Sequence, residues 1–222
     1  MGELAPELVP MLAAVEMPAN FIPVTNSVLA EMHRRGVGRD KLLSVLRSMG
    51  AEVPAASRAM LRWAAARDVD IRVLSDCNSV FIAHMLASAK VAPFVREVLT
   101  NPAMFERTPA NGETAHGVHR LVIGPRHDGG LPPHGCPLCP QNLCKGAELQ
   151  RLRAEAEAQG LPYKRVIYCG DGANDLCPAL ALREQDVLLA RRCVIRTAAC
   201  FFVVCWFNGC SIWLRHRSFL IF

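Results

Sequence analysis

Apolar side chains recur at spacings of three and four positions in the first part of the chain. The pattern covers Asn26–Arg35 and Gly38–Met49, and Gly50 follows the second segment. Such spacing places apolar residues on one face of a helix, and a glycine commonly follows the last turn. These segments predict a small helical subdomain. A further helix is expected over Ser57–Arg67, with its first serine as the cap.

Farther along the chain, short apolar runs end in polar or glycine-rich segments. Val69–Leu74 precedes Ser75-Asp76-Cys77-Asn78, and Arg165–Cys169 precedes a turn over Gly170–Pro178. Further elements are predicted as a helix over Lys145–Gln159, a helix near Pro178–Leu182 and a strand over Asp186–Ala190. Strands that alternate with helices predict an α/β fold with a Rossmann-like parallel sheet. The Gly- and Pro-rich residues 100–141 support short hairpins at most.

Two carboxylates, Asp171 and Asp175, lie four positions apart in the turn after the second predicted strand. Open α/β sheets bind ligands outside the carboxyl ends of their strands, and Mg²⁺ prefers carboxylate, water and phosphate oxygens. Ser75 is able to donate to a phosphate oxygen, and Lys145 adds a positive charge. The sequence thus predicts a site for Mg²⁺ and phosphate. The alternatives are a turn that only closes a strand, a capping serine and a solvated lysine.

Composition narrows the classes of protein that fit this pattern. The 222 residues are 51% hydrophobic, which excludes a disordered chain, and the net charge of +5 comes without a long basic block. We therefore expect no nucleic-acid partner. The N-terminal residues lack the pattern of a secretory signal, so the ten cysteines are expected to be reduced thiols of a cytoplasmic protein.

Three segments carry the polar residues in a recognisable order: Leu74-Ser75-Asp76-Cys77-Asn78, then Cys136-Pro137-Leu138-Cys139-Pro140-Gln141-Asn142-Leu143-Cys144-Lys145-Gly146, then Tyr168-Cys169-Gly170-Asp171-Gly172-Ala173-Asn174-Asp175-Leu176-Cys177-Pro178. From about residue 24 to Arg192, the chain resembles the phosphoethanolamine/phosphocholine phosphatase group of the haloacid-dehalogenase-type phosphatases. The resemblance implies a helical cap, Mg²⁺ and hydrolysis of a small phosphomonoester. The expected domains are a cap remnant at 1–55, a phosphatase-type core at 56–192 and an apolar tail at 193–222.

The resemblance also implies roles for single residues. Expected functional residues are Ser75 and Lys145 at the phosphate, Asp76 and Asn78 at the rest of the substrate, and Asp171 and Asp175 at the metal, the last in a supporting role. The carboxylate of Asp76 would suit a cationic ammonium group, as in phosphoethanolamine or phosphocholine. Other small phosphomonoesters remain open.

One motif of the family is absent from the sequence. Its catalysis uses an Asp-x-Asp-x-Thr segment at the end of the first strand, where one aspartate attacks phosphorus and the other acts as acid and base. The only Asp-x-Asp here is Asp68-Val69-Asp70, which precedes a predicted strand and has Arg72 at the fifth position. We expect a truncated chain without the first core strand and without phosphatase turnover. A non-catalytic protein that binds a phosphorylated ligand is the alternative.

The last part of the chain departs from the family. Residues 197–214 contain no charged side chain, which reaches the lower limit for a membrane span, although Asn208 and Gly209 weaken that interpretation. A membrane anchor is therefore one hypothesis for this tail. A translated intron or a misjoined exon is the other, because the composition changes where the family pattern stops.

A cysteine cluster suggests a different class of function. Cys136, Cys139 and Cys144, with His134 just before them, offer four ligands for tetrahedral zinc. Structural zinc sites usually use two separated pairs of ligands, and the sequence offers a single compact run. A zinc-binding protein is thus the second alternative to an Mg²⁺ phosphatase.

Overall fold

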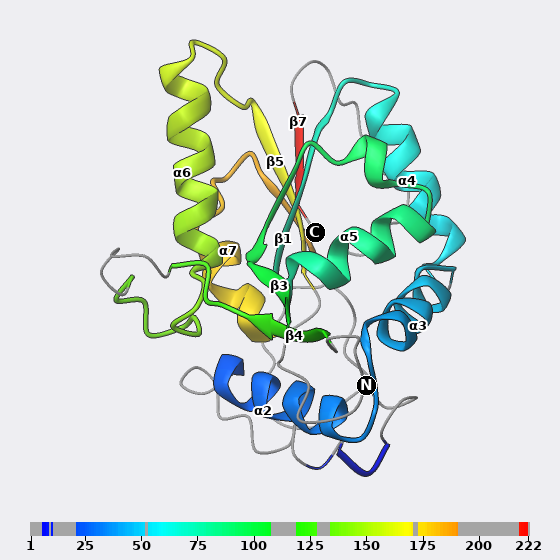
Figure 1. Ribbon diagram of the computed structural model, residues 1–222. Coiled ribbons are helices and arrows are strands. Elements are labelled where there is room, and N and C mark those ends of the chain that lie inside the picture. Colours follow the sequence, from blue (N-terminus) through cyan, green and yellow to red (C-terminus); the bar gives the residue numbers. More distant parts are fainter. Residues whose placement is uncertain are drawn as a thin grey trace, which may run out of the picture. The chain divides into compact units, whose positions relative to one another are not determined.

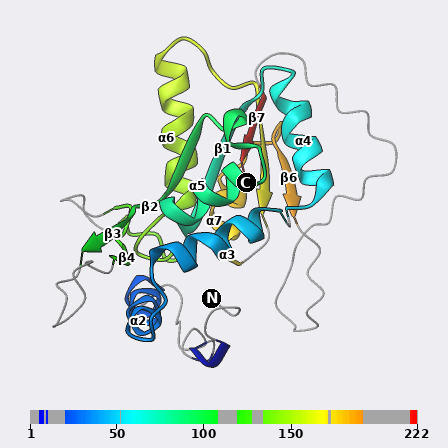
Figure 2. The ribbon, with the colours of Figure 1, turned by 45° about the vertical axis from the view of Figure 1, so that its right-hand side comes forward.

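The computed structural model contains a five-stranded sheet with the order β2-β1-β7-β5-β6. Its strands are β1 (Asp70–Asn78), β2 (Glu97–Asn101), β5 (Arg165–Gly170), β6 (Val187–Ala190) and β7 (Ser218–Ile221). β1 pairs with β7, β7 with β5 and β5 with β6, all in parallel. Figure 1 shows β7 in red between β1 and β5, and Figure 2 shows β6 in orange. The predicted α/β fold with a Rossmann-like sheet is confirmed.

The structure describes residues 6–8, 10, 21–51, 53–107, 119–127, 134–170, 173–190 and 218–221. The helices in these ranges are α2 (Phe21–Arg34), α3 (Arg39–Ala51), α4 (Ala55–Ala65), α5 (Ser79–Ser88), α6 (Lys145–Ala158) and α7 (Leu176–Leu180). Short 3-10 turns are η1 (Pro6–Leu8), η2 (Ala92–Phe94) and η3 (Ala173–Asp175). A two-stranded antiparallel sheet pairs β3 (Ala103–Arg107) with β4 (His119–Ile123), as the expected hairpins allow.

The chain divides into two compact units. The first consists of Met1–Arg58, Asp76–Ala92 and Thr100–Leu143, and the second of Ala59–Ser75, Pro93–Leu99 and Cys144–Phe222. In the first unit, α2 buries Val28, Leu29 and Met32 at helical spacing, together with Leu42 and Leu46 of α3. Because these residues repeat every three or four positions, the predicted amphipathic helices are confirmed. The predicted domain limits at residues 55 and 192 stay a prediction.

The second unit is built around β5 and α6. Val166, Ile167 and Tyr168 of β5 are buried, as are Leu149 and Leu152 of α6. Parallel strands buried on both faces are expected to be continuously apolar, as Val166-Ile167-Tyr168 is. The amino end of β5 is fixed by the carboxylate of Asp186, which accepts from the backbone N–H of Val166 at 2.7 Å. The same carboxylate accepts from the backbone N–H of Arg183 at 2.6 Å.

Strand β7 occupies the position where the sequence predicted a missing strand. Arg72 of β1 pairs with Ile221, and Ile221 pairs with Tyr168 of β5, so the three strands are in register. The facing edges of β1 and β5 therefore both find backbone partners in a strand from the C-terminal part of the sequence. The expectation that the chain lacks the family's first strand stays a prediction. Residues 197–214, the proposed anchor, lie outside the described residues. Within the described ranges, no helix has the length and apolar character that crossing a membrane requires.

The bounds of several predicted elements differ from those in the structure, and two elements were missed. Helix α4 begins at Ala55, so Ser57 lies inside the helix and is not its cap. Strand β1 continues through Ser75-Asp76-Cys77-Asn78, which the sequence had placed after the strand. The element near Pro178 is confirmed as a helix, although it begins at Leu176. Helix α5 and strand β2 were not predicted at all.

The packing of α3 against α5 depends on a glycine. A Cβ at Gly50 would lie 2.4 Å from the Cβ of Ser88 and 2.8 Å from the carbonyl oxygen of Met85. We expect Gly50→Ala to lower the free energy of unfolding by about 1–3 kcal/mol because α5 must move. Gly124→Ala is the control, since its Cβ would meet Pro102 at 3.6 Å, an ordinary contact distance. Urea denaturation of both variants tests this, and equal stability of the two would contradict it.

Candidate functional site

The carboxyl ends of β1 and β5 lie at the same edge of the sheet. Arg72 and Tyr168 are level with each other through Ile221 of β7. Counting two residues onward in both strands makes Leu74 level with Gly170, and Ser75 follows directly. Ser75 is half-buried. This register agrees with the prediction that the serine segment and the acidic turn meet at one edge of the sheet.

Lys145 and Asp175 form a buried ion pair in the second unit. The Nζ of Lys145 lies 2.7 Å from Oδ1 of Asp175, and each side chain is only 7% exposed. Lys145 is the first residue of α6, and Asp175 ends the 3-10 turn η3 after β5. The alternative of a solvated helix lysine is therefore wrong. A buried charge pair costs desolvation free energy and is weak evidence for stability, so its position beside the strand ends points to function.

A tyrosine completes the environment of this carboxylate. Tyr168 of β5 is fully buried, and its hydroxyl donates to Oδ1 of Asp175 at 2.6 Å. Two donors, a cation and a phenol, thus converge on one oxygen and hold the carboxylate in one orientation. No sequence pattern assigned a role to Tyr168, because a tyrosine inside a buried strand is indistinguishable from an ordinary core residue.

Two glycines allow the acidic turn to approach its neighbours. A Cβ at Gly170 would lie 2.8 Å from the Cβ and 3.0 Å from Oδ2 of Asp175. A Cβ at Gly146, in the first turn of α6, would lie 2.6 Å from the Sγ of Cys177. Real Cβ atoms do not approach other atoms this closely, so both positions require glycine for close contact. The glycines of the two motifs therefore bring Asp175 against β5 and α7 against α6.

The residues predicted at the rest of the substrate lie in the first unit. Asp76 and Asn78 are buried at the end of β1. The carbonyl of Asp76 accepts from Nδ2 of Asn101 at 2.7 Å. Oδ1 of Asn78 accepts from the N–H of Phe81 at 3.0 Å and so caps α5. The cap gives Asn78 a structural role, while its substrate role stays a prediction.

Asn101 connects two of the predicted motifs, although no sequence pattern singled it out. It is fully buried, and its Oδ1 accepts from Nδ2 of Asn142 at 3.0 Å and from the N–H of Arg126 at 3.3 Å. Asn142 belongs to the segment that leads into Lys145, and Asp76 belongs to the serine segment. One buried amide therefore binds the backbone of the serine segment and a side chain of the lysine motif.

The described residues are compatible with a hard cation at this edge. Asp175 supplies a buried carboxylate whose orientation is fixed by Lys145 and Tyr168. Carboxylate oxygens are the protein ligands that Mg²⁺ prefers. Asp171, the other predicted metal residue, lies outside the described residues, and its role stays a prediction.

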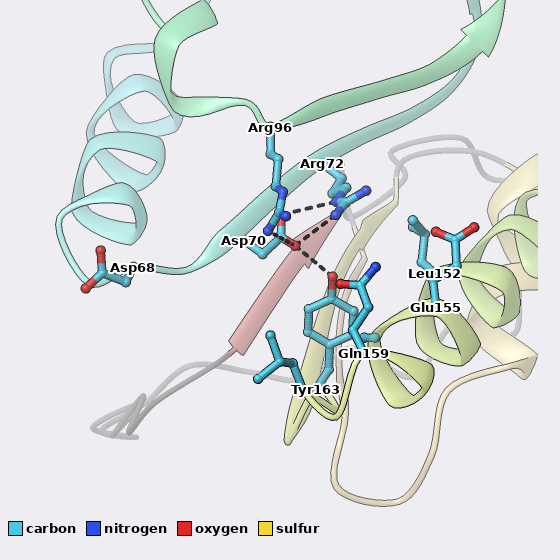
Figure 3. A pocket seen from close by; sticks show the side chains of 10 residues that line it. Asp68, Asp70, Arg72, Arg96, Leu152, Glu155, Gln159 and Tyr163 are labelled. Carbon is cyan, nitrogen blue, oxygen red and sulfur yellow. Dashed lines mark hydrogen bonds and ion pairs between the residues drawn. The ribbon is translucent and has the colours of Figure 1, made fainter.

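The opposite end of β1 has a different character. Asp70 begins the strand, and its carboxylate accepts two bonds from Arg72, at 3.0 and 3.1 Å, and one from the hydroxyl of Tyr163 at 2.7 Å (Figure 3). Arg96 lies 3.4 Å away. Burial and the bond to Asp70 raise the pKa of Tyr163 to about 12. These residues and Asp68 line a cavity of about 270 Å³. The prediction that Asp68-Val69-Asp70 lies before a strand and not at its carboxyl end is confirmed for Asp68 and Val69, while Asp70 is the first residue of the strand.

Comparison with known proteins gives several relatives. The chain is similar to inorganic pyrophosphatase 2 of Arabidopsis thaliana, with 32% identity over 79% of this chain and 58% of that protein. It is 35% identical to the thiamine phosphate phosphatase-like protein of Arabidopsis thaliana over 74% of this chain and 62% of that one. The chain is 37% identical to bovine pyridoxal phosphate phosphatase PHOSPHO2 over 55% of this chain and 45% of that protein.

The chain spans between 45% and 62% of the length of these three relatives. No solved structure matches it. The model of the family described as Putative Phosphatase matches residues 10–197, which is most of the chain. The serine, lysine and acidic motifs all fall inside this match. The chain therefore belongs to the Putative Phosphatase family, which is of the haloacid-dehalogenase type.

Proposed function

We propose that the edge formed by the carboxyl ends of β1 and β5 binds Mg²⁺ and the phosphate group of a small phosphomonoester. The observation that carries the proposal is the buried pair of Lys145 and Asp175, with Nζ and Oδ1 2.7 Å apart. The sheet register supports the same conclusion, because the end of β5 is level with the part of β1 that leads into Ser75, with β7 between the two strands. The three relatives described above are named for pyrophosphate, thiamine phosphate and pyridoxal phosphate. A phosphate group is what these compounds share.

Each residue has a defined task in this proposal. Lys145 donates from its ammonium group to phosphate oxygens, and its bond to Asp175 aims the ammonium. Ser75 donates its hydroxyl to the same group. Asp171 and Asp175 hold Mg²⁺, which when bound supplies positive charge to the phosphate oxygens. Burial of the pair strengthens these interactions, because the surroundings screen charge less than water does.

Substrate preference is assigned to the polar end of β1. Asp76 places a buried carboxylate there, and Asn78 lies two residues farther on. A carboxylate attracts a cationic ammonium group, so phosphoethanolamine and phosphocholine are the proposed ligands. A cytoplasmic location, in which the cysteines stay reduced, belongs to the same proposal.

Hydrolysis by the aspartyl-phosphate route needs an attacking carboxylate. The single Asp-x-Asp of the sequence is at Asp68-Val69-Asp70. Asp70 begins β1 and is bound by Arg72 and Tyr163, at the end of the strand away from Ser75. We therefore propose that this 222-residue chain binds the phosphorylated ligand without turnover, whereas hydrolysis belongs to a chain that also supplies the nucleophile. Release of inorganic phosphate from phosphoethanolamine by this chain with Mg²⁺ would contradict the proposal.

Replacement of the buried lysine tests phosphate binding. We expect Lys145→Met to weaken binding of phosphoethanolamine roughly 10- to 100-fold at saturating Mg²⁺, since a hydrogen bond from a charged group contributes about 1.5–3 kcal/mol. Isothermal titration calorimetry measures the change. Lys164→Met is the matched control, because Lys164 is exposed.

The double variant Lys145→Met/Asp175→Asn removes both buried charges and separates binding from instability, since a single replacement leaves one charge unpaired. Circular dichroism and urea denaturation report whether each variant is folded. Equal ligand affinity in the wild type and a folded Lys145→Met variant would refute a phosphate-binding role for this lysine.

The phenol of Tyr168 is expected to position the metal carboxylate. Tyr168→Phe removes the 2.6 Å bond to Asp175 and should lower the free energy of unfolding by about 1.5–3 kcal/mol. It should also weaken Mg²⁺ binding, measured by calorimetry. Tyr163→Phe removes a similar bond, to Asp70, and should reduce stability while leaving Mg²⁺ affinity unchanged. The same Mg²⁺ affinity in both variants would rule out positioning by Tyr168.

A further inference from the structure

Two cysteines approach each other beside the buried ion pair. Cys144 directly precedes Lys145, and Cys177 follows Asp175 by two residues. Their Sγ atoms lie 3.8 Å apart, where the beginning of α6 packs against α7. The missing side chain of Gly146 permits this approach, since a Cβ there would lie 2.6 Å from the Sγ of Cys177. The two motifs thus carry one thiol pair.

The loop before α6 carries a second pair in a Cys-x2-Cys arrangement, Cys136 and Cys139. Its conformation is fixed by His134, whose Nε2 lies 2.9 Å from the carbonyl oxygen of Pro140 and whose Nδ1 accepts from the N–H of Cys136 at 3.0 Å. Both ring nitrogens therefore bond to the loop backbone. The expectation that His134 is the fourth zinc ligand is replaced, because Cys177 supplies a fourth thiol.

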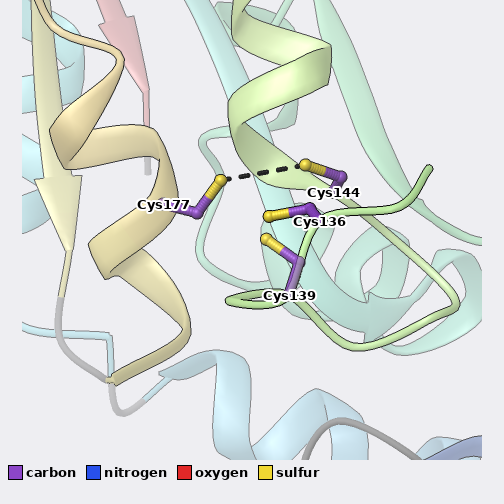
Figure 4. Close-up of side chains that lie close together, drawn as sticks. All are labelled: Cys136, Cys139, Cys144 and Cys177. Carbon is purple, nitrogen blue, oxygen red and sulfur yellow. Dashed lines mark hydrogen bonds between the residues drawn. The ribbon is translucent and has the colours of Figure 1, made fainter.

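The four sulfur atoms form a compact group. The Sγ atoms of Cys136, Cys139, Cys144 and Cys177 all lie within 4.8 Å of one another (Figure 4). A tetrahedral zinc site with Zn–S bonds of about 2.3 Å needs sulfurs about 3.8 Å apart. The separation of Cys144 and Cys177 equals that value. Cys139 and Cys144 are buried, and the other two are half-buried.

We propose that these four cysteines bind one Zn²⁺ as a structural tetrathiolate site. Each thiol loses its proton when the metal binds, and soft thiolates select zinc over Mg²⁺. Cys144 caps the N-terminus of α6, where the N–H of Ala147 donates to its Sγ at 3.4 Å. The site is chemically distinct from the oxygen site proposed for Mg²⁺.

The position of the proposed zinc site indicates a structural role for the metal. Its ligands adjoin Lys145 on one motif and Asp175 on the other, so the metal fastens together the starts of α6 and α7. This task depends on the proposed function, whereas the presence of zinc does not. Zinc in a protein that fails to bind phosphoethanolamine would therefore leave the metal site standing and refute only the phosphate site.

The metal content of the purified full chain tests the proposal. We expect one zinc per chain by inductively coupled plasma mass spectrometry, and loss of zinc in Cys139→Ser and Cys177→Ser. The matched control is Cys169→Ser, which should retain zinc. Burial raises the pKa of the Cys169 thiol to about 12, and Cys169 is outside the group of four.

A second measurement uses the wild type alone and so does not depend on the folding of a variant. Reduced, metal-free protein is titrated with Co²⁺, whose absorption spectrum separates tetrahedral thiolate from octahedral oxygen coordination. A tetrahedral thiolate spectrum at one Co²⁺ per chain, abolished by one equivalent of Zn²⁺, is expected. Absence of that spectrum would overturn the proposal. So would zinc-free protein with a Cys144–Cys177 disulfide found by mass spectrometry.

Discussion

The burial of one ion pair constrains the whole carboxyl edge of the sheet. Lys145 and Asp175 are both nearly inaccessible to water, and Lys145 donates to Asp175, which also accepts from the hydroxyl of Tyr168. A charge that is taken out of water without a partner costs several kcal/mol. A side chain at Gly170 would collide with the side chain of Asp175, and one at Gly146 with the Sγ of Cys177. Glycine at position 170 is thus a steric consequence of the close approach of the buried Asp175 to β5.

The sequence predicted the helices and strands that are marked by the pattern of their own residues. Helix α6 and strand β5 were placed nearly to the residue, because an apolar run marks β5 and a proline-free stretch rich in Ala, Glu, Leu and Arg marks α6. Helix α5 was missed because Ser79–Ser88 is apolar on most sides and shows little period. Strand β7 was missed because its place depends on pairing with β1 and β5, which no local pattern reveals.

Some residues of the candidate site could likewise be predicted from the sequence, and others could not. Ser75, Lys145 and Asp175 stand out in the sequence because the first follows an apolar run, the second begins a helix and the third lies in the Gly-rich segment after a strand. Asn101 and Cys177 do not, since their partners are far away in the chain: Cys177 lies 33 positions from Cys144. Asp70 shows the reverse case, a carboxylate in a suggestive spacing whose bonds to Arg72 and Tyr163 give it a structural task at the amino end of β1.

The central position of β7 also bears on the kinetics of folding. Strand β7 comes later in the chain than β1 and β5, yet it pairs with both. During synthesis those two strands therefore leave the ribosome with their inner edges unpaired, and they stay so until residues 218–221 emerge. Pairing over such sequence separations raises contact order and slows folding, and open strand edges invite association with other chains. The place of this one strand in the sheet thus makes the last part of the chain necessary for closing the gap between β1 and β5.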